Sequence, residues 1–332
     1  MKQKVKVAML GMGNMGKSHS NHLMQIQDVE IVAMCCENIS DAKKFAEDNN
    51  LNVKLFNDYY QMLEKVEFNV LYVCLPPYAH NGQVEAAAKR GIHIFIEKPI
   101  ALTVERATSM SDAVKENKVL SQVGYHMRFG GAVEKLKELI ETGIAGKPLL
   151  FTANYECNSL HSPWWIDVNK CGGQVFEQVI HLYDMAFYLL GNPDSVNGYT
   201  ANLNHQDTEG YTVEDTSISA IRFRNGSLAS ISGSNCAIPN QWNGYFKVVC
   251  QNLVAEFKDH NTAKFIYTSK ENGVEEISIP VDAGYEEDKY FISVVNGEKP
   301  EFAPISEGLV GLKMVSGVVE SSKNEGNSIK ID

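Results

Sequence analysis

The sequence lacks the features that mark membrane, secreted and nucleic-acid-binding proteins. No apolar run approaches the roughly 20 residues that span a bilayer, and Lys2, Lys4 and Lys6 interrupt the apolar stretch that a signal peptide would need. The seven cysteines form no C-x-x-C pair, and Cys35 and Cys36 are adjacent, which argues against a zinc site or a disulfide framework. We therefore expect a cytoplasmic protein with reduced thiols and no metal.

Basic residues are also scarce. Lys and Arg number 30 against 41 Asp and Glu, which gives a net charge of −11, and no basic run is present. Nucleic acid and anionic membrane surfaces are therefore not expected partners. Internal repeats and low-complexity segments are absent too, while 332 residues with 44% hydrophobic side chains exceed one ordinary core. The chain should form two globular domains.

A glycine triplet near the start is the most informative motif. Val5–Leu10 predicts a buried strand, and a helix is expected over residues 15–26. Between them, Gly11 permits a tight turn, Gly13 lets a pyrophosphate approach the backbone, and Gly16 lets helix and strand pack closely. A plain glycine-rich turn is the alternative. The residues predicted to contact a dinucleotide here are Gly11, Gly13, Asn14, Met15 and Gly16.

The rest of the first third alternates between strands and helices. Residues 30–37, 68–75, 92–96 and 119–124 are apolar runs typical of buried strands, with helical segments between them. This alternation predicts a doubly wound parallel sheet, in which ligands bind beyond the carboxyl ends of the strands. The candidate cofactor contacts at those ends are Leu75, Pro76, His80, Glu97 and Lys98.

The end of the second strand is expected to bind the adenosine ribose. Glu37 is the candidate acidic residue, with Cys36 directly before it, although Glu37 could equally be a solvated turn residue. An acidic side chain there would repel a 2′-phosphate, which favours NAD over NADP.

Lys98 is the candidate cation of the site. Burying a lysine beside a cofactor is costly, but its ammonium could bind a substrate hydroxyl and stabilise negative charge on oxygen. The alternative is a surface pair between Glu97 and Lys98 that closes the strand.

The second half of the chain predicts a long helix and then a sheet. Glu177, His181 and Asp184 would share one face of a helix over residues 174–190, which is either a solvated polar side or the lining of a site. After Pro193, short alternating strands predict antiparallel hairpins, and a helix capped by Ser306 is expected near the end. Trp164 and Trp165 either stack on a sugar ring or simply pack.

Five motifs taken together resemble the glucose–fructose oxidoreductase and inositol dehydrogenase family (Gfo/Idh/MocA type). They are the glycine triplet Gly11-x-Gly13-x-x-Gly16, the proline turn with His80, Glu97-Lys98-Pro99, Tyr125-His126-Met127-Arg128-Phe129, and Gly172 to His181 with Asp184. The resemblance implies an N-terminal Rossmann domain over residues 1–124. It also implies a C-terminal α+β domain over residues 125–332, whose large, mostly antiparallel sheet binds substrate and mediates a homo-oligomer (dimer or tetramer). A cis peptide bond before Pro99 is implied as well.

The resemblance also implies residue roles. Lys98 and His181 would be the catalytic pair, with Glu177 orienting His181 and Asp184 in support. Substrate contacts would come from Lys98, Tyr125, Trp165, Glu177 and His181, and Arg128 would contact cofactor or substrate. The family often has Asp at the positions of Glu177 and Cys36, and the second departure leaves NAD and NADP both open.

These observations predict an NAD(P)-dependent dehydrogenase acting on CH–OH groups. It would transfer a hydride between nicotinamide and a secondary alcohol of a polyol, sugar or sugar derivative, with His181 as general acid and base. One alternative is a glycoside-processing enzyme that uses a tightly bound NAD transiently. Another is a non-catalytic dinucleotide-binding protein.

Overall fold

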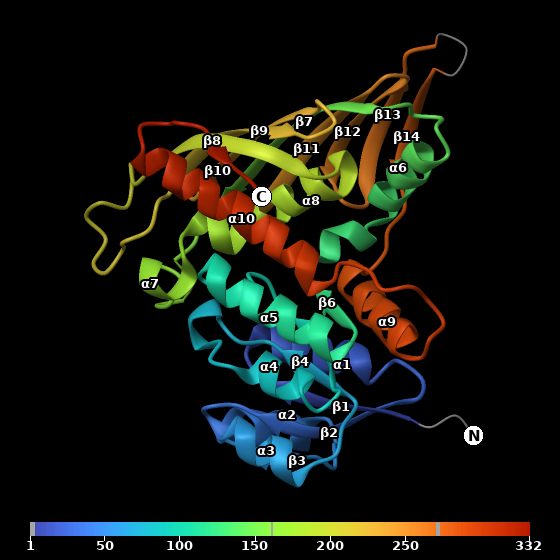
Figure 1. Ribbon diagram of the computed structural model, residues 1–332, viewed down its shortest axis with the longest axis vertical. Helices are drawn as coiled ribbons and strands as arrows, with labels where there is room; N and C mark the ends of the chain where they lie inside the picture. The colour runs from blue at the N-terminus through green and yellow to red at the C-terminus, as the bar shows by residue number, and fades with distance from the viewer. Residues whose placement is uncertain (1–3, 161, 270–272) are drawn as a thin grey trace. The chain divides into compact units, whose positions relative to one another are not determined.

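Two compact units make up the chain. The computed structural model describes residues 4–160, 162–269 and 273–332, and Figure 1 shows them. One unit comprises Met1–Tyr125 with Gly284–Leu309, and the other comprises His126–Ala283 with Val310–Asp332. The sequence predicted a single boundary after residue 124. The structure differs, because a segment near the C-terminus packs into the first unit.

The first unit contains a six-stranded parallel sheet in the order β3-β2-β1-β4-β5-β6. The strands are β1 (Val5–Leu10), β2 (Val29–Cys35), β3 (Lys54–Phe56), β4 (Val70–Val73), β5 (His93–Ile96) and β6 (Ser121–Val123). The strand order reverses between β1 and β4, which is where such sheets bind ligands. The doubly wound fold is as predicted, and β3 is an addition too short to show a periodic pattern.

Helices connect these strands, and several begin at side-chain caps. The helices are α1 (Asn14–Leu23), α2 (Ile39–Asp48), α3 (Tyr59–Lys65), α4 (Gln83–Ala88), α5 (Val104–Asn117) and α9 (Ala283–Val295), with a short 3-10 turn η1 (Pro77–Ala79). The side chains of Asn38, Asp58 and Thr103 each accept a backbone N–H in the first turn of α2, α3 and α5.

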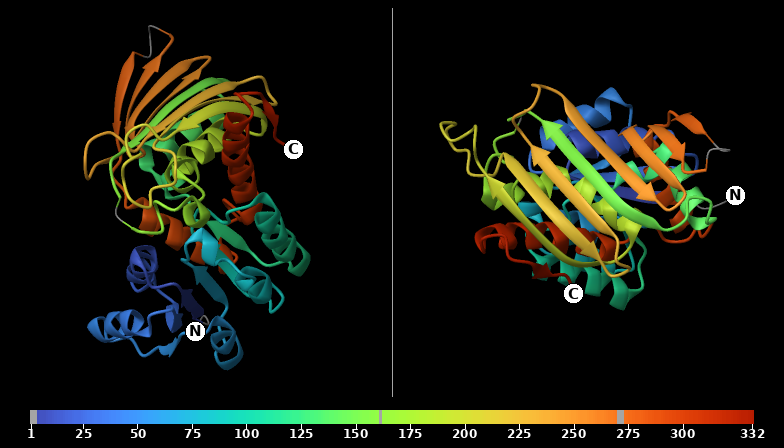
Figure 2. Two further views of the ribbon diagram at one scale, coloured as in Figure 1. Left: turned by 90° about the vertical axis from the view of Figure 1, so that its left-hand side faces the viewer. Right: turned by 90° about the horizontal axis from the view of Figure 1, so that it is seen from above.

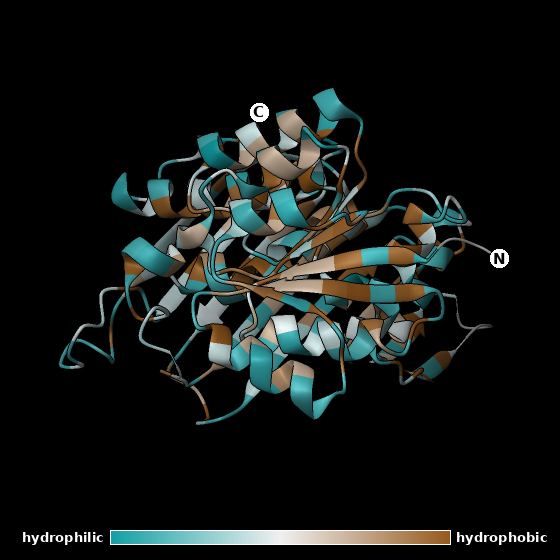
Figure 3. Cartoon of the chain, turned by 90° about the horizontal axis from the view of Figure 1, so that it is seen from below, coloured by the Kyte–Doolittle hydropathy of each residue, from teal (hydrophilic) through white to brown (hydrophobic). Residues whose placement is uncertain are grey.

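The core of the first unit explains why α9 belongs to it. Tyr72 of β4 stacks on Phe95 of β5, with ring centroids 4.5 Å apart. Phe291 and Ile292 of α9 are buried in the same apolar cluster as these strands. In Figure 3, apolar residues are concentrated on the strands, and the helices carry polar residues outward. Burial of the apolar face of α9 therefore fixes it against a sheet that lies far away in sequence.

The second unit contains a nine-stranded sheet in the order β14-β13-β12-β11-β7-β10-β9-β8-β15. Neighbours are antiparallel except β7 and β10, which are parallel. The strands are β7 (Pro148–Cys157), β8 (Pro193–Ala201), β9 (Thr216–Phe223), β10 (Leu228–Ser234), β11 (Trp242–Cys250), β12 (Leu253–Asp259), β13 (Thr262–Tyr267), β14 (Val274–Ser278) and β15 (Ile329–Lys330). Both predicted hairpins, β9–β10 and β11–β12, are present.

Helices cover one face of this sheet, and Figure 2 shows the strands of the other face uncovered. The helical segments are η2 (His126–Phe129), α6 (Gly131–Glu141), α7 (Val168–Cys171), the π-helix η3 (Val175–Val179), α8 (Ile180–Leu190) and α10 (Ile305–Lys323). The predicted helix over residues 174–190 is thus a π turn followed by α8. Ser306 is not the cap of the last helix, since Ile305 is already helical.

No helix among the described residues is both long and apolar enough to cross a membrane.

Candidate active site

The glycine turn has the geometry of a dinucleotide site. A Cβ atom on Gly11 would lie 2.4 Å from the carbonyl oxygen of Cys74, and one on Gly16 would lie 2.0 Å from that of Gly11. By contrast, no described atom lies within 4 Å of a Cβ placed on Gly13. Gly13 is the N-cap of α1 and offers no side chain to its free N–H groups. Two glycines therefore close the turn and the third leaves room for a pyrophosphate.

The ribose candidates lie at the end of β2. Glu37 is exposed, whereas Cys36 is half-buried and donates its thiol proton to the carbonyl oxygen of Asn38 at 3.1 Å. Burial raises the pKa of the Cys36 thiol. Glu37 thus has the freer side chain and the formal charge at this strand end.

At the end of β4, the proline turn holds a neutral histidine. His80 is 5% exposed, and its Nδ1 lies 2.6 Å from the carbonyl oxygen of Ile100. Burial lowers the pKa of His80. Leu75 and Pro76, just before it, are half-buried.

The end of β5 buries Glu97 and leaves Lys98 partly exposed. Glu97 is 5% exposed, and its Oε2 accepts the backbone N–H of Lys98 at 3.1 Å. Lys98 is half-buried, and its bond to Pro99 is cis, as expected. Because β5 lies beside β4, and β4 beside β1, the carboxyl ends that carry Lys98, the proline turn and the glycine turn adjoin one another.

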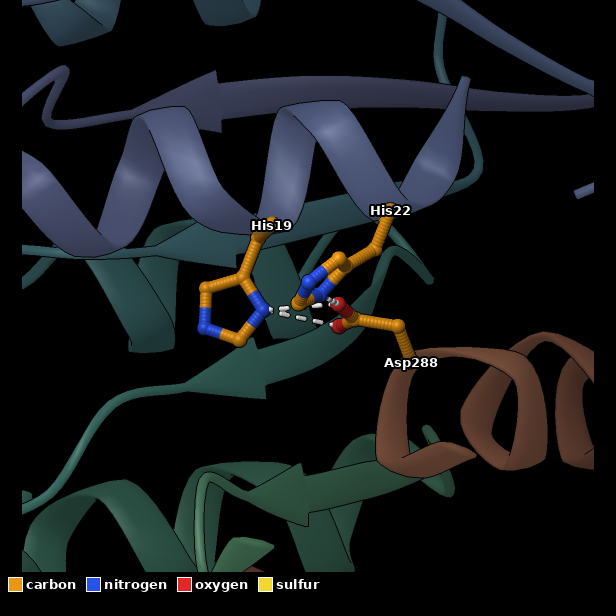
Figure 4. Close-up of side chains that lie close together, drawn as sticks. All are labelled: His19, His22 and Asp288. Carbon is orange, nitrogen blue, oxygen red and sulfur yellow. Dashed lines mark hydrogen bonds and ion pairs between the residues drawn. The ribbon is translucent and has the colours of Figure 1, made fainter. Parts of the chain in front are cut away.

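Two further side chains complete this strand end. His19 of α1 bonds Glu97 through Nε2 at 2.9 Å and Asp288 of α9 through Nδ1 at 2.8 Å, while Asp288 also bonds His22. Figure 4 shows the two histidines converging on the carboxylate. Neither His19 nor Asp288 was predicted from the sequence. The position of His19, three residues after Gly16, was a usable sign, but no local pattern pointed to Asp288.

In the second unit, His181 lies in a group of three imidazoles. It is 6% exposed, and its ring centroid lies 4.8 Å from that of His126, which lies 5.7 Å from that of His260. Burial lowers the pKa of His260. His126 was noted in the sequence only as part of a motif, and His260 was not noted.

The π-helix carries Glu177 into a small pocket. Glu177 is 8% exposed and lines this pocket together with Trp165. The remaining lining residues are Ser159, Ile166, Gly173, Gln174, Gln178, Tyr211, Val213 and Asn235. Trp164 instead packs against a small apolar cluster of Cys171, Tyr211 and Val213. A π turn at this position is typical of a functional site.

Asp184 of α8 forms a buried ion pair with Arg128 of η2. The Nε and Nη2 atoms of Arg128 donate to the carboxylate of Asp184 at 2.9 and 2.6 Å, and both residues are almost fully buried. The guanidinium also lies over the ring of Tyr188, 4.8 Å from its centroid. Asp184 therefore holds η2 against α8. Tyr125, just before η2, is 1% exposed.

Glu214 anchors the start of the π-helix, and the sequence did not predict it. Its Oε1 accepts the N–H of Val175 at 2.7 Å. A Cβ on Gly173, whose φ is +115°, would lie 2.4 Å from the carboxylate. Glycine at position 173 thus makes room for the acid that orients the segment bearing Glu177 and His181.

The comparisons with known proteins agree with this architecture. Residues 5–125 match the model of an oxidoreductase family with an NAD-binding Rossmann fold, and residues 133–255 match the GFO/IDH/MocA C-terminal domain. A scyllo-inositol 2-dehydrogenase (NAD(+)) of Bacillus subtilis is 30% identical over 236 residues, covering 70% of this chain and 68% of that protein. A D-glucoside 3-dehydrogenase of Escherichia coli is 30% identical over 240 residues, covering 68% of each.

Among solved structures, a levoglucosan dehydrogenase in complex with NADH and levoglucosan has the same fold. The TM-score is 0.88 over 99% of this chain and 100% of that one, at 22% identity. With the family models covering most of the chain and the curated relatives at this identity, the chain belongs to the GFO/IDH/MocA family of oxidoreductases, as a dehydrogenase whose first unit is the family's NAD-binding Rossmann domain.

Proposed function

We propose that this dehydrogenase transfers a hydride between NAD and a secondary alcohol of a polyol, sugar or sugar derivative. The observation that carries the proposal is the position of Lys98 at the carboxyl end of β5. In the sheet, β5 lies beside β4, and β4 lies beside β1, whose carboxyl end leads into the glycine turn. Two similar proteins are named for inositol and for a glucoside. Both substrate classes offer secondary alcohols.

In this proposal each residue acts on the alcohol oxygen or its proton. NAD, when bound, accepts the hydride from the carbinol carbon. The Lys98 ammonium binds the alcohol oxygen and stabilises the negative charge that develops there. His181 takes the hydroxyl proton in oxidation and returns it in reduction, and Glu177 orients His181 from the same helical segment.

Four further residues are proposed to select the substrate and the nucleotide. Trp165 lines the pocket beside Glu177 and offers an aromatic face to a sugar ring. Tyr125 and Arg128 are proposed to shape the site from positions just before and within η2. The exposed carboxylate of Glu37 favours NAD, because it would repel the 2′-phosphate of NADP.

The proposal is tested by NADH formation from NAD with a panel of inositols, free sugars and methyl glucosides. We expect His181→Ala and Lys98→Met each to reduce kcat by about 100-fold or more, with the NAD dissociation constant nearly unchanged. Unaltered turnover in either variant would contradict the mechanism. Cleavage of a glycoside without net NADH would identify the glycoside-processing alternative instead.

We also propose that the uncovered face of the nine-stranded sheet forms a homo-oligomer. Successive strands expose large apolar side chains on that face, among them Leu150, Tyr199, Ile218, Leu228 and Tyr245. The strand pairings place these positions on one side. A patch of this kind marks an interaction surface. Light scattering of the wild type should show a dimer or tetramer. The double variant Ile218→Glu with Leu228→Glu should dissociate it.

A cytoplasmic location is part of the proposal, supported by seven cysteines without a disulfide pattern.

A further inference from the structure

His19 is buried between two carboxylates. It is 1% exposed, and its Nδ1 lies 2.8 and 2.9 Å from the two oxygens of Asp288, while its Nε2 lies 2.9 Å from Oε1 of Glu97. Ionised carboxyl groups only accept hydrogen bonds, so with Asp288 and Glu97 ionised both ring nitrogens donate and His19 is an imidazolium. It is held between α9 and the end of β5.

The surrounding charges sustain that state. Burial alone would lower the pKa of His19, but the carboxylates of Asp288 and Glu97 outweigh it and hold the pKa well above its ordinary value. The other titratable groups around His19 are His22 on α1, Tyr72 and Cys74 at the end of β4, and Glu287 on α9. Burial raises the pKa of Cys74 to about 12, so this thiol stays neutral.

Glu97 passes this constraint on to Lys98. One oxygen of its carboxylate bonds His19, and the other accepts the backbone N–H of Lys98. On a further side the carboxylate lies against Gly124, where an added Cβ would be 2.8 Å from Oε1. These three contacts hold the Glu97 carboxylate in one position, and the backbone N–H of Lys98 is held with it.

We propose that His19 is a positioning residue, which as an imidazolium held by Asp288 keeps Glu97, and through it the backbone of Lys98, in place for the reaction. This inference rests on the proposed function, because the role of Lys98 belongs to that proposal.

Asp288→Asn is the informative change. The Asn oxygen can still accept the Nδ1 proton of His19, so the shape of the cluster is kept while its charge is removed. Without that charge His19 loses its second proton at a lower pH. Whichever nitrogen gives up the proton, the charge-assisted hydrogen bond from Nε2 to Oε1 of Glu97 is weakened or lost. Glu97 is then held less firmly, and the amide of Lys98, which bonds the same carboxylate, registers the change. Lys98 in this variant therefore becomes sensitive to pH.

The direct test uses the full-length protein labelled with 15N in histidine and lysine. In the wild type, the His19 side-chain signals should stay those of an imidazolium between pH 6 and pH 9, and the Lys98 amide signal, assigned by its loss in Lys98→Arg, should not titrate. In Asp288→Asn, both signals should titrate with one midpoint within that range. A neutral His19 in the wild type, or a Lys98 amide that ignores the titration of His19, would overturn the proposal.

His22→Gln is the matched control. His22 bonds the same carboxylate, at 2.8 Å, whereas the hydrogen bond to Glu97 comes from His19. We expect the wild-type pattern for both signals in this variant. The three side chains His19, His22 and Asp288 could also hold a cation, so zinc is added as a further arm. Stoichiometric loss of the His19 protons on addition of zinc chloride would replace the positioning role by a metal site.

Kinetics separate this inference from the proposed function. With a substrate from the panel, kcat is measured as pH rises from 6 to 9. The decrease in kcat over this range should be about 10-fold larger for Asp288→Asn than for the wild type, since small misplacements of catalytic groups are costly. If Lys98→Met keeps its turnover, the proposed function fails whatever the spectra show. If Lys98→Met is inactive but Asp288→Asn shows no coupled titration, only the positioning role fails.

Discussion

Replacing Glu214 by glutamine tests how one buried carboxyl makes the second unit sensitive to pH. Burial raises the pKa of Glu214 from 4.5 to about 7, against the opposing effect of backbone N–H groups that include those of Val175 and Gln174. The neighbouring charge of Asp215, whose own pKa is lowered to about 2, adds to the rise. Glutamine has nearly the same shape and keeps an oxygen for the Val175 N–H, but it does not titrate.

The direction of the effect follows from proton binding. Between pH 4.5 and about 7 the folded protein holds a proton on Glu214 that the unfolded chain has released. The free energy of unfolding therefore falls as pH rises through this range and levels off above it. A rise from 4.5 to about 7 spans about 2.5 pKa units, which corresponds to about 3 kcal/mol at 1.36 kcal/mol per unit.

Tryptophan fluorescence makes the measurement specific to the second unit. All three tryptophans, at positions 164, 165 and 242, lie there. Urea unfolding at pH 5 and pH 8 gives the free energy of unfolding of both proteins. The difference between Glu214→Gln and the wild type should be about 2 to 3 kcal/mol more favourable to the variant at pH 8 than at pH 5. Glu209→Gln, an exposed position on the same loop, is the control and should show no such gain. An equal difference between Glu214→Gln and the wild type at both pH values would refute the reasoning.

Other predictions concern the glycine turn and the Arg128 pair. Gly13→Ala should leave the melting temperature of the free protein unchanged but weaken NAD binding about 10-fold or more by calorimetry, because the added methyl meets only the cofactor; unchanged affinity would argue against the pyrophosphate site. Gly16→Ala should lower the melting temperature even without NAD, since its Cβ would lie 2.0 Å from the Gly11 carbonyl oxygen. Asp184→Ala should destabilise the second unit by about 3 to 5 kcal/mol, because it removes the carboxylate that accepts two hydrogen bonds from the buried Arg128 guanidinium, and a loss below about 1 kcal/mol in urea unfolding would contradict a buried ion pair.

Much of the fold could be predicted because its patterns are local. The strands β1, β2, β4 and β5 are apolar runs bounded by turn residues, and the β9–β10 hairpin follows from alternation around Asn225-Gly226. The π turn at Val175–Val179 could not be predicted, because a helical period of 3.6 residues fits the same side chains equally well. Glu214, which bonds the first turn from another part of the chain, could not be predicted from local spacing either.

By itself, the sequence determined the Rossmann turn and the parallel sheet of the first domain, which depend on residue type and on neighbours within a turn or two. Lys98, Glu177 and His181 became candidates only through the resemblance of their motifs to a known family. Only the tertiary structure decided that α9 joins the first unit and that Asp288, 269 residues from His19, charges the histidine that holds Glu97. A local pattern records which face of an element is apolar. It does not record which distant carboxylate will be buried against that face, since packing of the whole unit sets that choice.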